Sequence, residues 1–189
     1  WISINKAETK EGIAMNDQRF EQSIRRILKN DKEGLREIYE DYCPMIYSVV
    51  LDILKNREDA EDITSDFFIR LWDIAGSYKG GSGHRAWLIT IARNMAIDHF
   101  RKQKRQQPMA EIPDHLLQSP SPEDAVVKNI SLAHALKTLK EEERQIINLK
   151  IMGQLTFKEI AQILNKPQGT VAWVYRNAVG KLKRCGYEQ

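Results

Sequence analysis

The sequence lacks any long apolar run. Of its 189 residues 42% are hydrophobic and 29% are charged, and no apolar segment approaches the roughly 20 residues that a helix needs to cross a bilayer. The N-terminal stretch "WISINKAETKEGIAMNDQ" does not begin with Met and has no apolar core of the kind found in secretion signals. We therefore expect a cytoplasmic protein without membrane insertion.

Residues that bind metals or form disulfides are also scarce. Cys43 and Cys185 are the two cysteines, and their separation gives neither a disulfide framework nor a zinc-ligand spacing. The four histidines are scattered, at His84, His99, His115 and His134, without the paired spacing of a metal site. We expect no metal and no other cofactor.

Alternating apolar and polar residues, which are typical of strands, do not occur over any useful length. Apolar residues instead recur at helical spacing in the segments 18–28, 35–54, 60–74 and 85–105. Pro44 predicts a break or a kink in the second segment. The expected apolar stripes of the third and fourth segments are Ala60, Ile63, Phe67, Ile69, Leu71, Trp72 and Ile74, then Trp87, Ile91, Met95 and Phe100. Between them, "SYKGGSGHR" has three glycines and two serines, which predicts an exposed loop.

Proline and acidic residues gather between residues 106 and 128. This stretch holds four of the six prolines and four acids, with no Lys or Arg before Lys128, and its composition predicts an extended linker. Helical spacing resumes after it. The predicted fold is therefore all-α, with two small helical domains, 16–105 and 129–187, joined by a Pro-rich acidic linker.

The segment "LTFKEIAQILNKPQGTV" has the parts of a helix-turn-helix. Thr156 and Glu159 form the T-x-x-E capping box of a first helix. Asn165 tolerates the left-handed conformation that ends a helix, and Pro167 is compatible with the first turn of the next one. Taken alone, this local pattern also fits an ordinary antiparallel helix pair within a core.

Acidic residues are absent from 160–187, whereas this run carries Arg176, Lys181, Lys183 and Arg184. A helix that enters the major groove must keep carboxylates away from phosphates, so the absence favours DNA binding. Elsewhere, residues 31–73 hold twelve acids and five bases, and residues 85–105 hold six bases and one acid. These separate blocks predict a protein partner for one face and a polyanion for the others.

The motifs "REDAED", "FFIRLW" and "RAWLITIARNMAIDHFR", followed by the helix-turn-helix segment, occur in this order along the chain. Over about residues 18–182 the sequence resembles the two-domain bacterial RNA polymerase sigma factors of the extracytoplasmic-function (ECF) group. The resemblance implies a non-enzymatic subunit whose partners are core RNA polymerase, through its β′ coiled coil and β flap, promoter DNA and an anti-sigma factor.

The resemblance also implies a role for individual residues. Those matching the polymerase-docking helix are Asp59, Asp62, Asp66 and Arg70. Those matching the part that captures the melted minus-ten element are Tyr78, Lys79, His84, Arg85, Arg93, Asn94, Arg101 and Lys104. Those matching the part that reads the minus-thirty-five element are Gln168, Thr170, Trp173, Arg176, Asn177 and Lys181.

The chain departs from the family pattern at two places. His84 stands where relatives usually have Phe, and "AWV" at residues 172–174 replaces a common polar run. Polar side chains normally read base edges, so other contacts, including apolar ones to thymine methyl groups, are expected there.

Two alternatives remain at this point. One is a helix-turn-helix regulator that binds duplex DNA without core polymerase. The other is a metal-dependent enzyme that uses Glu58, Asp62 and Asp66, although no second carboxylate motif answers them elsewhere in the sequence.

Overall fold

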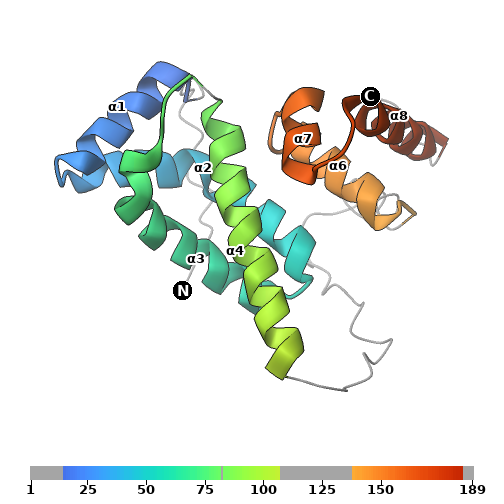
Figure 1. Ribbon diagram of the computed structural model, residues 1–189, viewed down its shortest axis with the longest axis horizontal. Coiled ribbons are helices and arrows are strands. Elements are labelled where there is room, and N and C mark those ends of the chain that lie inside the picture. Colours follow the sequence, from blue (N-terminus) through green and yellow to red (C-terminus); the bar gives the residue numbers. More distant parts are fainter. Residues whose placement is uncertain (1–14, 82, 107–137, 185–189) are drawn as a thin grey trace, which may run out of the picture.

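The computed structural model describes residues 15–81, 83–106 and 138–184, and every regular element in these ranges is helical. The helices form two groups, α1 to α4 and α6 to α8 (Figure 1). The bounds of the first group are α1 Asp17–Leu28, α2 Lys32–Leu54, α3 Arg57–Ile74, the 3-10 turn η1 Ala75–Ser77, and α4 His84–Gln106. Those of the second are α6 Glu141–Ile151, α7 Phe157–Leu164 and α8 Gln168–Arg184. The all-α prediction is confirmed.

Side-chain caps set where the first three helices begin. Asn16 Oδ1 accepts a hydrogen bond from the backbone N–H of Arg19 at 2.9 Å, Asp31 Oδ1 accepts one at 3.0 Å at the start of α2, and Asn56 caps α3 in the same way. Such caps satisfy N–H groups that have no partner inside the helix. The central helix α2 packs against α1, α3 and α4, around fully buried side chains that include Phe20, Ile38, Ile46, Phe67, Leu71, Leu88 and Ile89.

The structure corrects three details of the predicted helices. Of the two outcomes predicted at Pro44, the break does not occur, because α2 runs through this residue as one helix; the predicted kink stays a prediction. Ile69 is 66% exposed and Phe100 is 44% exposed, so neither belongs to a buried stripe. Leu71 and Phe67 are fully buried as expected, whereas Trp72 is only partly buried.

The loop between η1 and α4 contains the predicted glycine-rich turn. Gly80, Gly81 and Gly83 have φ values of 58°, 67° and 71°, a region that other residues rarely adopt. The expectation of an exposed loop is wrong at its end, because His84 opens α4 and is only 5% exposed.

The second group has the predicted helix-turn-helix in α7 and α8. Thr156 and Glu159 form the capping box, with the Thr156 N–H donating to Glu159 Oε2 at 2.7 Å. Asn165 has φ 51° and ψ 51° and ends α7, and Pro167 precedes α8 and accepts from the Val171 N–H. The turn is therefore built by the residues that predicted it.

The two groups share one apolar core rather than keeping separate ones. Ile146, Leu149, Leu155, Ile160 and Val171 belong to the same buried cluster as the core of α1 to α4. A smaller cluster, formed by Leu139, Ile147 and Ala178, lies within the second group. The predicted domain bounds therefore remain a proposal, and the predicted linker, from residue 107 on, lies outside the described residues.

Polar contacts accompany this shared core. Ser48 Oγ donates to Asn148 Oδ1 at 2.9 Å, and Asn148 Nδ2 donates to the Ser48 carbonyl at 3.1 Å. Arg144 Nε donates to Asp52 Oδ1 at 3.0 Å. Asp52 also accepts from Lys55 at 2.8 Å. The bonds of Asn148 and Arg144 attach α6 to α2.

Candidate functional site

The outer face of α3 presents charged side chains around an exposed isoleucine. Asp62, Asp66 and Arg70 are exposed, and their spacing of four residues places them along one side of the helix. Ile69, beside Arg70, is 66% exposed. An apolar centre within a charged rim is the composition of a protein-binding surface.

Asp59 differs from the other three docking candidates, because it faces α4. Its carboxylate accepts a hydrogen bond from Gln103 Nε2 at 3.3 Å and lies 3.4 Å from His99 Nε2. Its side chain is 22% exposed. In this arrangement Asp59 joins α3 to α4.

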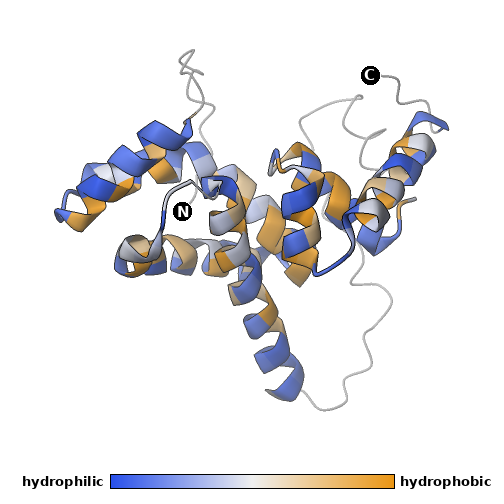
Figure 2. Ribbon diagram, turned by 45° about the horizontal axis from the view of Figure 1, so that its top comes forward, coloured by the Kyte–Doolittle hydropathy of each residue, from blue (hydrophilic) through white to orange (hydrophobic). Residues whose placement is uncertain are grey.

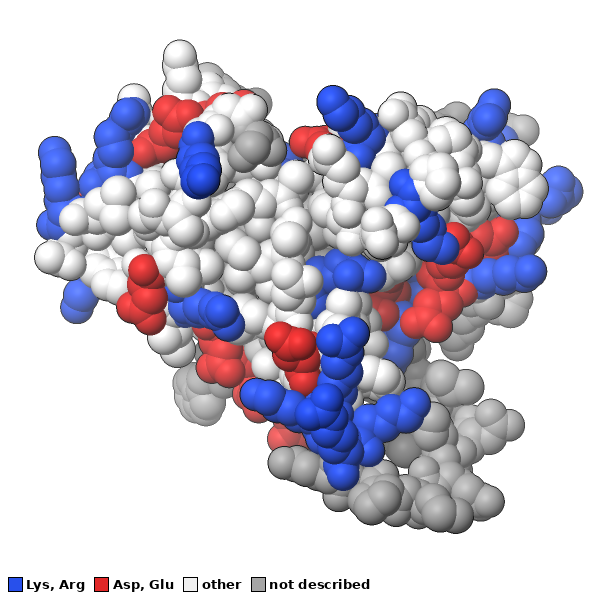
Figure 3. Space-filling view, viewed as in Figure 1, with Lys and Arg blue, Asp and Glu red and all other residues white. Residues whose placement is uncertain are grey.

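The far end of α4 is a strongly basic projection. Arg101 and Lys104 are exposed, and Lys104 Nζ lies 6.0 Å from the centroid of the exposed Phe100 ring. This part of α4 is hydrophilic and extends beyond the other helices (Figure 2). Lys and Arg side chains gather at this lower end, while Asp and Glu side chains lie beside it over α3 (Figure 3). Together the exposed cations and the aromatic ring offer what single-stranded nucleic acid binds, phosphate-tracking charge and a stacking surface.

The loop-side candidates for minus-ten recognition are largely occupied by contacts within the protein. Tyr78 packs on Phe20 and Trp87, with ring centroids 5.1 Å apart in both cases. Burial, together with nearby acids, raises the pKa of Tyr78. The Arg85 guanidinium lies over the Tyr42 ring, 5.4 Å from its centroid. Lys79 and Asn94 are exposed.

His84 joins the N-terminal helix to α4. Its ring stacks on Phe20 with centroids 4.7 Å apart and an interplanar angle of 20°. Its Nδ1 bonds to the Asp17 carboxylate and its Nε2 to the Tyr42 hydroxyl. The imidazole thus fills an aromatic position in the core while also forming two polar contacts, which a Phe side chain could not make.

Arg93, on α4, lies next to α6 of the second group of helices. Its Nε is buried and has no hydrogen-bond partner among the described residues. Burial lowers the pKa of Arg93. The small cavity beside it is lined by Val49, Asp52, Gln145, Asn148 and Leu149, which come from α2 and α6. Arg93 is therefore half-buried beside α6, and its Nε is not accessible to a polyanion in this arrangement.

The candidates on α8 fall into an exposed set and an engaged one. Gln168, Thr170, Trp173 and Arg176 are exposed, and Asn177 is half-buried. Lys181 instead donates to both carboxylate oxygens of Glu143, at 2.7 and 2.8 Å, and so ties α8 to α6.

The Glu143 carboxylate is held in its charged form. Burial works against that form, but hydrogen bonds from Lys181 and from the backbone N–H of Lys140 outweigh it, so the pKa of Glu143 is lowered. The Lys140 bond, at 2.8 Å, also caps α6. Glu143 therefore stabilises the packing of the second group.

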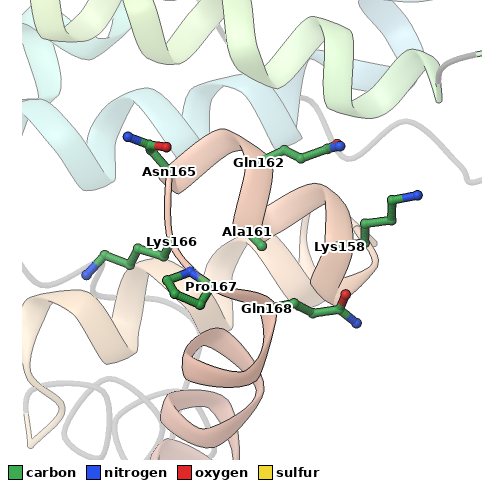
Figure 4. A pocket seen from close by; sticks show the side chains of 7 residues that line it. All are labelled: Lys158, Ala161, Gln162, Asn165, Lys166, Pro167 and Gln168. Atoms are coloured by element: carbon green, nitrogen blue, oxygen red, sulfur yellow. The ribbon is translucent and has the colours of Figure 1, made fainter.

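A hollow of about 480 Å³ lies at the turn of the helix-turn-helix. Side chains from the end of α7 and the start of α8 surround it (Figure 4): Lys158, Ala161, Gln162, Asn165, Lys166, Pro167 and Gln168. The rim is polar and basic and has no carboxylate among these residues. One of its cations, Lys166, is paired with Glu142.

The described residues offer neither a metal-ligand cluster nor a membrane-spanning helix. Within 15–81, 83–106 and 138–184 no group of His, Cys, Asp and Glu is arranged to hold a metal ion. In the same part of the chain no helix is both long enough and apolar enough to span a membrane.

Sequence reasoning missed several features of these surfaces. Asn148 and Ser48 are 100 positions apart in the sequence, and Arg144 and Asp52 are 92 positions apart. No local pattern indicates that these pairs are hydrogen-bonded. No sequence pattern indicates the ion pair of Lys181 either. A cation on a DNA-binding helix looks the same in sequence whether or not a carboxylate binds it.

Comparison with known proteins assigns both groups of helices. The protein-family model of Sigma-70 region 2 matches residues 38–106, and that of Sigma-70, region 4 matches residues 135–184. The ECF RNA polymerase sigma factor SigW of Bacillus subtilis is 31% identical over 170 residues, covering 78% of this chain and 86% of that protein. The sigma factor BldN of Streptomyces coelicolor is 27% identical over 172 residues, covering 88% of this chain and 65% of that protein.

Solved structures agree on the fold. The sigma factor RpoE in complex with the anti-sigma factor NepR from Bartonella quintana has a TM-score of 0.61 at 21% identity, covering 82% of this chain and 96% of that one. CnrH in complex with the cytosolic domain of CnrY has a TM-score of 0.58 at 19% identity, covering 89% of this chain and 96% of that one.

Proposed function

Because this chain belongs to the extracytoplasmic-function sigma factors, we propose that it directs core RNA polymerase to its promoters and helps to open them, and that it has no enzymatic activity of its own. The proposal rests on the matches of both sigma regions in one chain, together with a relative that is 31% identical and is covered over 86% of its length. A regulator acting without core polymerase would not account for the region 2 match. The cytoplasm, where bacterial polymerase works, is its proposed location.

We assign the polymerase-binding surface to the outer face of α3. Asp62, Asp66 and Arg70 are exposed there, and Ile69 adds the apolar centre. The proposed target is the β′ coiled coil, with the β flap contacting the region 4 helices. Asp59 would support this surface by fixing α3 on α4 through Gln103.

The proposed promoter contacts divide between the two groups of helices. For the minus-ten element the accessible residues are Lys79, Asn94, Arg101 and Lys104. Tyr78, His84 and Arg85 would position the loop, and the half-buried Arg93 lies at the edge of this surface, beside α6. For the minus-thirty-five element, the exposed α8 residues Gln168, Thr170, Trp173 and Arg176 would meet DNA, with Asn177 at their edge.

An anti-sigma factor is a further proposed partner. The two solved relatives are described as complexes, one with the anti-sigma factor NepR and one with the cytosolic domain of CnrY. The proposed bounds are 16–105 for core docking and minus-ten recognition, 106–128 for the linker and 129–187 for minus-thirty-five recognition.

Assembly with purified core polymerase tests the docking assignment. The double charge reversal Asp62→Lys with Asp66→Lys should weaken binding to core at least tenfold, because it opposes a complementary charged surface. Asp98→Lys, on an exposed part of α4, makes the same chemical change elsewhere and should leave core affinity unchanged. If the two variants lost equal affinity, the assignment of α3 would be wrong, and no binding of wild type to core would sink the proposed function.

A further inference from the structure

The helix α8 has one face that is largely exposed. Val171, Val174 and Ala178 are buried on the opposite side. At 100° per residue, the free side is formed by Gly169, Trp173, Arg176, Gly180 and Lys183. The face thus combines one large aromatic ring, two glycines and two cations.

Trp173 is the most exposed aromatic side chain among the described residues, at 60%. A large apolar ring left in water is unfavourable for the free protein, and a single ring placed at the centre of a charged helix face is typical of a contact residue. Nothing in the described chain packs against this ring as a partner aromatic, whereas the rings of Phe157 and Tyr175 on the buried side pair at 5.3 Å.

The two glycines on this face have no internal explanation. A Cβ added at Gly169 or at Gly180 would meet nothing within 4 Å, and neither has the positive φ that would call for glycine. Glycine within a helix is less favourable than alanine. Their advantage must then come from outside the described chain, where a missing side chain lets another surface approach the helix closely on either side of Trp173.

The charges on this face indicate which kind of partner binds it. No acid occurs from residue 160 to residue 187, and Arg176, Lys183 and Arg184 carry positive charge. The Arg176 Nε donates to the Ala172 carbonyl of its own helix at 3.3 Å, which leaves both terminal amino groups free for an outside acceptor. A partner with dense negative charge and apolar spots within a groove is duplex DNA, whose major groove displays the thymine methyl groups.

We infer that Trp173 reads thymine, by packing its ring on the C5-methyl group in the major groove, while Gly169 and Gly180 allow the DNA to come close and Arg176 contacts a phosphate or a guanine beside it. This inference rests on the proposed function and adds a specificity determinant to it. The ring takes over, by apolar contact, a task that polar side chains perform in the resembling family.

The test removes single methyl groups from the DNA. The probe is a duplex promoter mapped from a transcription start made by core polymerase with the full chain, with each upstream thymine replaced in turn by deoxyuridine. Loss of one buried methyl contact weakens binding of the holoenzyme about fourfold, and we expect this loss at one or two positions. With Trp173→Ala the thymine probe should bind more weakly, and the preference for thymine over deoxyuridine at those positions should vanish.

Two further variants complete the test. Trp173→Phe keeps a smaller apolar ring and should keep part of the preference. Leu28→Ala truncates an apolar side chain of similar exposure, 58%, on the distant helix α1 and should leave the preference intact. Full sensitivity to deoxyuridine in Trp173→Ala, or none in the wild type, would overturn the inference.

Other outcomes separate this inference from its premise. If Trp173→Ala lost affinity for core polymerase but not for the duplex, the ring would be a protein contact and the inference would be wrong. Absence of any transcription start with the wild type would refute the proposed function itself, whereas a mapped start whose thymines are insensitive to methyl removal would refute only the role of Trp173.

Discussion

Replacement of Lys181 by Ala should destabilise the protein rather than remove a DNA contact. Its ammonium donates to both oxygens of Glu143 at 2.7 and 2.8 Å, and the side chains of the two residues are 32% and 10% exposed. Breaking a fully buried pair costs about 3–5 kcal/mol and breaking an exposed one about 0–1 kcal/mol. Because the carboxylate is buried and the ammonium is partly solvated, we expect a loss of about 2 kcal/mol in the free energy of unfolding.

The matched control is Lys183→Ala, two residues further along the same helix and exposed. This variant should change stability by less than about 0.5 kcal/mol. If Lys183 meets a phosphate, the slope of log affinity against log salt for duplex DNA should fall by about 0.9. Urea unfolding and binding at several salt concentrations measure both effects. If Lys181→Ala unfolds at the wild-type urea midpoint and lowers the salt slope as Lys183→Ala does, Lys181 contacts DNA and does not stabilise the packing of α8 on α6.

Four other predictions follow from the same structure. Lowering the pH should weaken the packing of the second helical group, because folding lowers the pKa of Glu143. The stability that the Glu143 carboxylate contributes is present above its ordinary pKa and is lost as the pH falls through its folded pKa. The stability of Glu143→Gln should therefore depend less on pH in the acid range. His84→Ala should lower the free energy of unfolding, measured by heat or urea, by about 2–4 kcal/mol, because it removes a buried ring and two hydrogen bonds. If His84→Ala were less destabilised than His84→Phe, the role described for the imidazole would be wrong. Asp52→Ala should speed amide hydrogen exchange in α6 without affecting α1, since it removes the acceptor of Arg144, and unchanged exchange would show that this bond does not hold α6. Arg101→Ala combined with Lys104→Ala should weaken open-complex formation, measured by permanganate footprinting, while core binding stays the same; equal loss of both would refute the assignment of α4 to DNA.

Local features of this fold could be predicted because the groups involved are close in sequence. The capping box joins Thr156 and Glu159, which are three positions apart, and the turn at Asn165 follows from one residue's backbone preference; both are present. The break expected at Pro44 was also inferred from a local preference, but here packing in the core outweighs that preference. A proline inside a helix costs about 3 kcal/mol, but Met45 and Ile46, directly after it, are buried in the core, and their burial holds the helix together across it.

Surfaces and long-range contacts were harder to predict. Helical spacing alone placed Ile69 in the apolar stripe of α3, yet it is exposed, because periodicity counts apolar residues without knowing which side a neighbouring helix covers. The placement of Arg93 beside α6 depends on how two distant segments pack, so its basic charge pointed to DNA while its present surroundings are protein. The sequence proposes the candidate residues, whereas their accessibility required the structure.

The most direct test of the central claim is run-off transcription from genomic DNA fragments with purified core polymerase, with and without this chain. If the chain is a sigma factor that works with core polymerase, discrete transcripts should appear only when it is added, from starts preceded by shared minus-ten and minus-thirty-five elements. The same set of transcripts from core polymerase alone, or site-specific DNA binding by the chain with no transcript on any fragment, would contradict this claim.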